Sequence, residues 1–144
     1  MKQLDLYRHA QRDPHADKLS PEGVARAEDV GRSMPRDYVV VFISPKQRAA
    51  ETVAWLLRGS GQQLPPHSIV EGLAGPPDEV AGVVGELFDQ IPEGGKALAV
   101  GHTPLVEEAA LGLTGVVVEP LAECEGVRLF RAEDGTTTLE ELRL

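Results

Sequence analysis

Two histidines and two arginines lie in three short segments, each of which follows an apolar run. Arg8 and His9 follow "LDLY", Arg48 lies in "SPKQR" after "YVVVFI", and His102 follows "ALAVG". A guanidinium group matches two phosphate oxygens at once and keeps its charge at any working pH. A neutral imidazole can attack phosphorus and form a phosphoenzyme, which divides one difficult step into two. Further cations stabilise the transferring phosphoryl group, so these four residues could carry out phosphoryl transfer without a metal.

The elements that precede these residues are expected to be strands. Residues 3–8 alternate, with Leu4 and Leu6 on one side, whereas residues 38–44 and 96–102 are continuous apolar runs. Such runs are typical of strands buried on both faces of a sheet. In open α/β sheets, ligands bind beyond the carboxyl ends of the strands. We therefore expect the four residues to meet at one edge of a sheet.

Helices are expected to begin where a hydroxyl residue is followed by proline. This pair occurs at Ser20-Pro21, Ser44-Pro45 and Thr103-Pro104, and it predicts an N-cap and a first helical residue. Gly59 is expected to end the second of these helices. The junctions at Ser44 and Thr103 also offer free backbone N–H groups, which favour anions.

The remaining segments complete an α/β pattern. Residues 59–68 are rich in glycine, proline and glutamine and are expected to form a loop, whereas residues 77–95 have the apolar spacing of an amphipathic helix. Residues 127–144 contain two strand-like runs around "EDG", which predicts a hairpin. The order of elements predicts a three-layer α/β/α sandwich, whose sheet is mainly parallel with an antiparallel edge. The length of 144 residues fits a single domain over 1–144.

Composition excludes several classes of function. The formal charge of −9 argues against nucleic-acid binding and against attraction to anionic membranes. The lone Cys124 excludes a disulfide framework, and no residue cluster predicts a metal site or another cofactor. No apolar run is long enough for a signal peptide core or a membrane helix, so we expect a cytoplasmic protein. An anionic substrate would need a local positive pocket, and the oligomeric state cannot be predicted.

Four motifs, in order along residues 4–105, resemble those of the histidine phosphatase superfamily, which has the phosphoglycerate mutase-like fold. They are "LYRHA", "DKLSPEGVARA", "SPKQRAAETV" and "AVGHTP". The resemblance implies that His9 is the phosphorylated nucleophile and that Arg8, Arg48 and His102 form the rest of the phosphate pocket. The short chain most resembles the SixA-type phosphohistidine phosphatases within this superfamily.

The chain also departs from the family pattern. Ala10 replaces the usual glycine, which requires that φ be negative there. More importantly, Leu73-Ala74-Gly75 stands where mutases and many phosphomonoesterases have Leu-x-Glu, their general acid. Nearby carboxylates that could replace it are Glu79, followed by Asp78 and Glu71. Asp78 is also a plausible N-cap for its helix. Lys18 is a further candidate for binding substrate at the mouth of the pocket.

The missing acid has a chemical consequence. An alkoxide is a poor leaving group, with a conjugate acid close to water in pKa, about 15.7, whereas imidazole has a pKa of about 6.5 and needs less protonation. The sequence therefore favours a phosphatase acting on phosphohistidine proteins. The alternatives are a small-molecule phosphomonoesterase, a phosphoglycerate mutase-like enzyme, or a non-enzymatic phosphate-binding regulatory module. The two histidines argue against the last, because a binder requires arginines but no nucleophile.

Overall fold

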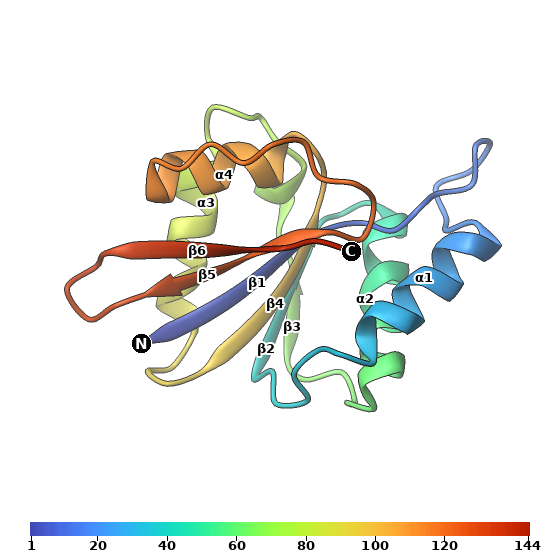
Figure 1. The fold of residues 1–144 in the computed structure, drawn as a ribbon, viewed down its shortest axis with the longest axis horizontal. Coiled ribbons are helices and arrows are strands. Elements are labelled where there is room, and N and C mark those ends of the chain that lie inside the picture. The colour runs from blue at the N-terminus through green and yellow to red at the C-terminus, as the bar shows by residue number, and fades with distance from the viewer.

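The computed structural model describes residues 1–144 and contains one six-stranded sheet with helices on both faces (Figure 1). Its strands, in chain order, are β1 (Lys2–Arg8), β2 (Val40–Ile43), β3 (His67–Ile69), β4 (Lys96–Gly101), β5 (Gly126–Arg131) and β6 (Thr137–Leu142). Their order across the sheet is β3-β2-β4-β1-β5-β6. The first four are parallel, whereas β5 is antiparallel to both β1 and β6. The predicted parallel sheet with an antiparallel edge is thus confirmed.

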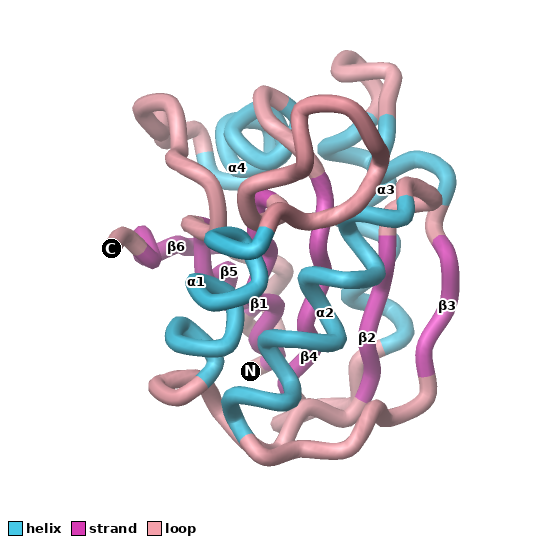
Figure 2. Tube along the Cα trace, turned by 90° about the vertical axis from the view of Figure 1, so that its right-hand side faces the viewer, coloured by secondary structure: helices cyan, strands magenta, loops and turns pink.

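The helices form the two outer layers of the sandwich. Figure 2 shows α1 (Pro21–Gly31) and α2 (Gln47–Ser60) in front of the strands, whereas α3 (Val80–Leu87) and α4 (Leu105–Thr114) lie behind them. Short 3-10 turns cover Glu71–Ala74 and Phe88–Gln90. Because side chains alternate along a strand, Leu4 and Leu6 belong to the core on the side of α3 and α4, whereas Tyr7 belongs to the core beneath α1 and α2.

The three predicted helix starts have different outcomes. Ser20 is an N-cap as predicted, since its Oγ accepts a hydrogen bond of 3.0 Å from the N–H of Gly23. The prediction for Ser44 is wrong, because α2 begins only at Gln47 and its N-cap, Lys46, makes no side-chain cap. The Ser44 hydroxyl bonds to His102, and it also accepts a hydrogen bond of 3.4 Å from the N–H of Lys46. The prediction for Thr103 is also wrong: α4 begins at Leu105, and the Thr103 hydroxyl donates to Glu107.

The end of α2 differs from its prediction as well. The helix continues past Gly59 to Ser60, and Gly61, with a φ of 80°, provides the left-handed cap. Gly59 lies instead where α2 contacts α1, because a Cβ atom there would be 2.0 Å from the carbonyl oxygen of Glu28. The glycine at position 59, which predicted the end of the helix, therefore allows α1 and α2 to pack closely.

Two further boundaries were misplaced. The helix expected over 77–95 is restricted to α3 and its 3-10 extension, and Glu79 rather than Asp78 occupies the N-cap. Strand β3 lies partly within the predicted loop. All three β3 residues are exposed at the sheet edge, so the strand has no apolar alternation to reveal it.

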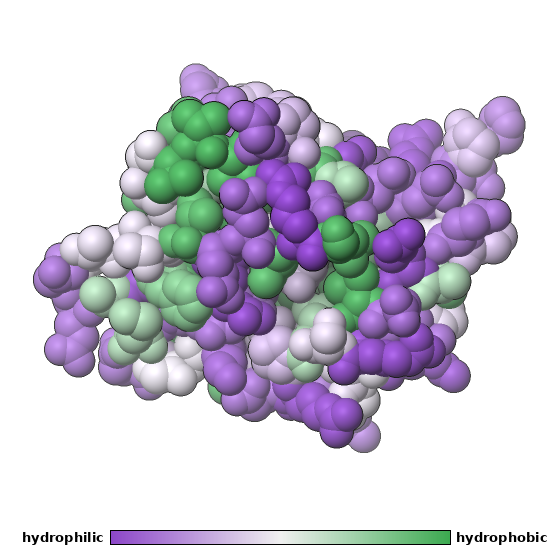
Figure 3. All heavy atoms as spheres, in the orientation of Figure 1, coloured by the Kyte–Doolittle hydropathy of each residue, from purple (hydrophilic) through white to green (hydrophobic).

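The surface differs between the two sides of the sheet. Figure 3 shows hydrophobic residues gathered over α4 at upper left and hydrophilic residues over α1 at right. None of the helices combines the length and the apolar composition that crossing a membrane requires.

Candidate active site

The carboxyl ends of three neighbouring strands bring the predicted residues to one edge of the sheet. Arg8 at the end of β1 is in register with Gly101 at the end of β4, and the N–H of His9 donates to the Gly101 carbonyl at 3.0 Å. Beyond β2, the N–H of Ser44 donates to the carbonyl of Val100 at 3.1 Å. Parallel pairing therefore places the residues after β1, β2 and β4 side by side, as the sequence predicts.

His9 is held as a neutral imidazole with a defined tautomer. Its side chain is buried, and Nδ1 donates to the Ala10 carbonyl at 2.7 Å. Nε2 accepts a hydrogen bond of 3.3 Å from Arg48 Nε, so this nitrogen carries the lone pair. Burial lowers the pKa of His9 below its usual value, and the charges of Arg48 and Arg8 lower it further. Nε2 is therefore available as a nucleophile near neutral pH.

His102 lies directly beside His9. The two ring centroids are 5.3 Å apart, and His102 Nε2 forms a hydrogen bond of 2.5 Å with Ser44 Oγ. Burial, followed by the electrostatic effects of His9, Arg48 and Lys46, lowers the pKa of His102 to about 4. Its Nδ1 is buried and has no hydrogen-bond partner in the protein. A phosphate oxygen next to His9 could supply that partner.

Arg8 is fixed from the opposite side by the loop before β5. Its Nη1 donates to the Leu121 carbonyl at 2.7 Å, while its buried Nε has no protein partner. Glu107 holds this loop, because its Oε2 accepts from the Leu121 N–H at 3.1 Å and from the Thr103 hydroxyl at 2.5 Å. The guanidinium of Arg8 is thus anchored at one nitrogen and keeps another free for an anion.

Arg48 lies in the first turn of α2, between His9 and Asp17. Arg48 Nη1 donates to Asp17 Oδ1 at 2.9 Å, in addition to the bond from Nε to His9. Thr52, one turn later, accepts from the N–H of Ala10 at 3.0 Å and donates to the Arg48 carbonyl at 2.8 Å. Helix α2 therefore binds directly to the segment that contains the candidate nucleophile.

Ala10 does not disturb this arrangement. It is fully buried in the core, and it does not have a positive φ, which only Cys124 has among the residues other than glycine. The condition for replacing glycine by alanine at this position is therefore met.

The side chains of the predicted acids and of Lys18 form no hydrogen bond or ion pair with these residues. Glu79, Asp78 and Glu71 are exposed, and none of their side chains forms a hydrogen bond or ion pair. Lys18 is also exposed, and only its backbone carbonyl is bonded, to the N–H of Asp13 at 2.7 Å. The roles given to Glu79 and Lys18 stay predictions that no contact supports.

A different carboxylate acts on the site. The charge of Glu123, in the loop before β5, raises the pKa of His9 against the larger effects of burial and the arginines. The next residue, Cys124, donates its N–H to the His9 carbonyl at 3.2 Å, which fixes this loop at the nucleophile. Sequence reasoning missed Glu123, because nothing near it in the chain indicates its electrostatic effect on His9. It also missed Asp17 and the bond from Ser44 to His102.

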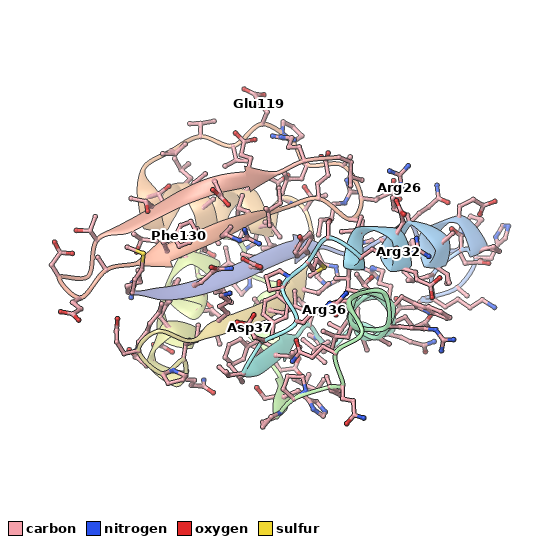
Figure 4. The ribbon with its side chains drawn as sticks, turned by 60° about the horizontal axis from the view of Figure 1, so that its bottom comes forward. Arg26, Arg32, Arg36, Asp37, Glu119 and Phe130 are labelled. Atoms are coloured by element: carbon pink, nitrogen blue, oxygen red, sulfur yellow. The ribbon has the colours of Figure 1, made fainter.

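Several cations outside this group of residues are paired with carboxylates. Figure 4 shows Arg32 at the C-terminal end of α1 and Asp37 shortly before β2. Arg32 pairs with Asp29 at 2.9 Å, and Asp37 pairs with Lys96 at 3.1 Å. The cationic side chains that act on His9 and His102 are those of Arg8, Arg48 and Lys46, within a chain of net charge −9.

No protein-family model matches the sequence, and no curated protein matches it either. The fold, in contrast, matches solved structures along nearly the whole chain. The protein histidine phosphatase SixA in complex with tungstate is 20% identical with a TM-score of 0.77, and the match covers 98% of this chain and 96% of SixA. Phosphoserine phosphatase from Entamoeba histolytica, in complex with 3-phosphoglyceric acid, is 16% identical with a TM-score of 0.79, covering 100% of this chain and 98% of that protein.

Phosphoglycerate mutase from Plasmodium falciparum is 17% identical with a TM-score of 0.71, and the match covers 97% of this chain and 89% of the mutase. The chain therefore has the phosphoglycerate mutase-like fold, and its similarity to SixA agrees with the resemblance seen in the sequence motifs.

Proposed function

We propose that this protein, which has the fold of the histidine phosphatases, is a phosphatase that acts through a phosphohistidine at His9 and needs no metal. The observation that carries the proposal is the tautomer of His9. Its Nδ1–H is fixed on the Ala10 carbonyl, which leaves the Nε2 lone pair among Arg48, Arg8 and His102. A regulatory module that only binds phosphate would not require an imidazole prepared in this way.

The reaction has two displacements at phosphorus. His9 Nε2 attacks the phosphorus atom, the N–P bond forms, and the bond from phosphorus to the leaving group breaks with its electron pair on the leaving group. Arg8 and Arg48 balance the charge of the phosphoryl oxygens during transfer. His102, beside His9, also stabilises the transferring phosphoryl group. Water then attacks the phosphohistidine, loses a proton, and releases inorganic phosphate and neutral His9.

The favoured substrate is a phosphohistidine in another protein. Its leaving group is an imidazole, with a pKa of about 6.5, so departure requires little help from an acid. The position where related enzymes have their acid holds Gly75, and the carboxylates of Glu79 and Asp78 are exposed without side-chain partners. These features support a leaving group that departs readily.

A small phosphomonoester is the second candidate substrate, and Glu123 favours it. This carboxylate influences His9 electrostatically, and its loop is tied to the His9 carbonyl through Cys124. A carboxylic acid at this place could protonate a departing alkoxide. In this variant of the proposal Glu123, rather than Glu79, is the general acid.

Turnover of an aryl phosphate tests the phosphatase mechanism. His9→Ala is expected to abolish turnover and the acid-labile phosphoenzyme that rapid quenching traps in the wild type. His67→Ala is the matched control, because His67 is exposed on the edge strand β3. Full turnover in His9→Ala would show that the nucleophile is another group.

Rates on two kinds of substrate test the substrate class. We expect faster hydrolysis of a phosphohistidine protein than of a panel of phosphomonoesters, and little effect of Glu79→Gln or Asp78→Asn on either. Fast cleavage of the esters, lost in Glu123→Gln, would favour the second candidate. Loss in Glu79→Gln alone would instead support the acid expected from the sequence.

A further inference from the structure

Asp17 links the N-terminus of α2 to the arginine beside the candidate nucleophile. Its carboxylate accepts hydrogen bonds from the N–H of Gln47 at 2.9 Å and from the N–H of Arg48 at 3.3 Å. The same carboxylate accepts from Arg48 Nη1 at 2.9 Å. One side chain from a distant segment therefore caps the helix, which has no cap of its own, and holds the guanidinium.

These contacts determine which edge of the guanidinium faces His9. A guanidinium group is planar, so fixing Nη1 leaves little freedom for the other nitrogens. With Nη1 on Asp17, the Nε–H of Arg48 is directed to His9 Nε2 at 3.3 Å. Nη2 has no hydrogen bond to a protein group. Asp17 therefore orients Arg48 toward the nucleophile and leaves one nitrogen for a phosphoryl oxygen.

The segment that carries Asp17 is itself tied down. The base of the 10–19 loop is closed by the bond from the Ser20 N–H to the Gln11 carbonyl at 3.0 Å. The N–H of Leu19 donates to Glu51 Oε1 on α2 at 3.1 Å. The position of Asp17 is consequently fixed by the hydrogen bonds of its own loop as well as by Arg48, although 41% of its side chain is exposed. A fixed carboxylate can position a partner, whereas a freely mobile one could not.

From this geometry we infer that Asp17 is a positioning residue, which holds Arg48 so that its guanidinium faces both His9 and the transferring phosphoryl group. The inference rests on the proposed function and adds a residue to it. Asp17 itself does not contact the reacting atoms, because its oxygens are occupied by Arg48 and the helix amides. The competing interpretation is that Asp17 only stabilises the start of α2.

The two interpretations predict different changes in the pKa of His9 when Asp17 is replaced. The charged or titratable groups that act on His9 are Arg8 from β1, Arg48 from α2, His102 after β4 and Glu123 from the loop before β5. Arg48 lowers the pKa of His9, so releasing Arg48 should raise it. Loss of the Asp17 charge alone would lower a histidine pKa or leave it unchanged. A rise is therefore specific to lost positioning.

The test compares Asp17→Ala and Asp17→Asn with Asp13→Ala. Asp13 is the matched control, because it contributes the same charge in the same loop but its side chain bonds only to the N–H of His15. NMR titration of the His9 ring should show a higher pKa in Asp17→Ala, a smaller rise in Asp17→Asn, and no rise in the control. Asparagine keeps one acceptor oxygen, so this variant preserves the test if alanine prevents folding.

Kinetics provide the second measurement. We expect kcat/KM for an aryl phosphate to fall roughly 10- to 100-fold in Asp17→Ala, the size of effect that a misplaced catalytic group causes. An unchanged His9 pKa and unchanged kcat/KM in both folded Asp17 variants would overturn the role of Asp17. Turnover that persists in His9→Ala would instead overturn the proposed function, and the NMR result would still decide whether Asp17 orients Arg48.

Discussion

Ser44 Oγ and His102 Nε2 form a hydrogen bond of 2.5 Å that joins the residue after β2 to the residue after β4. Both side chains are buried, and Ser44 lies before α2, whose N-cap is Lys46. The bond fixes the orientation of the His102 ring beside His9. It therefore couples the pairing of two strands to the geometry of the candidate active site.

Ser44→Ala should weaken phosphatase activity without unfolding the protein. Losing one hydrogen bond of about 1 kcal/mol corresponds to a roughly fivefold decrease in kcat/KM, because the His102 ring is less well oriented. Steady-state kinetics on an aryl phosphate measures the effect. Ser60→Ala is the control, since Ser60 is equally buried but lies at the opposite end of α2. An equal loss in both variants would attribute the effect to general destabilisation.

The lowered pKa of His102 should make the folded state less stable in acid. His102 changes from a pKa of 6.5 to about 4 on folding, so between these values the unfolded chain binds the proton and the folded chain does not. The free energy of unfolding should therefore fall as the pH falls through this window, by about 2 kcal/mol between about pH 7 and about pH 5 from this residue.

Urea unfolding of the wild type and of His102→Gln at the two pH values measures this contribution. His9 contributes in the same direction, because its pKa is also lowered on folding. The variant should lose less stability on acidification than the wild type, whereas the control His67→Gln should behave like the wild type. An identical pH dependence in His102→Gln would contradict the prediction.

The sheet could be predicted because its signals are local. The apolar runs before His9, Ser44 and His102 required buried strands, and parallel pairing then required their ends to meet. That is why four residues spread over most of the chain could be grouped from the sequence. The 3-residue strand β3, which is exposed at the edge, offered no such signal.

The partners of these residues could not be predicted, because they come from distant segments. Asp17 and Arg48 are 31 positions apart, and Arg8 and Leu121 are 113 positions apart. Helix-start patterns failed for a related reason. The hydroxyl of Ser44 has a tertiary partner in His102 and accepts only a local bond of 3.4 Å from the Lys46 N–H, whereas the N–H groups of Gln47 and Arg48 donate to Asp17.

Arg8→Lys should impair activity far more than the retained charge suggests. Arg8 Nη1 is occupied by the Leu121 carbonyl, and its Nε remains for the phosphate. A lysine has one compact ammonium group, which cannot occupy the positions of both guanidinium nitrogens, so we expect kcat/KM to fall roughly 100-fold, within the range seen for lost electrostatic donors. Arg131→Lys is the matched control. Arg131, the last residue of β5, is also partly buried, but its guanidinium lies over the ring of Phe88. Near wild-type activity in Arg8→Lys would remove Arg8 from the phosphate site.

Gly59→Ala should destabilise the protein, although alanine is the better helix former. In a free helix the exchange stabilises by up to about 1 kcal/mol. At Gly59 the new Cβ would lie 2.0 Å from the Glu28 carbonyl oxygen and 3.1 Å from the Cα of Gly31, so α1 and α2 would have to separate. Gly82 is the control within α3, because a Cβ there meets nothing within 4 Å.

Thermal and urea unfolding measure the effect. We expect the free energy of unfolding to fall by about 2 kcal/mol or more in Gly59→Ala and to rise slightly in Gly82→Ala. Equal gains in both variants would show that the two helices do not pack as closely as this contact requires.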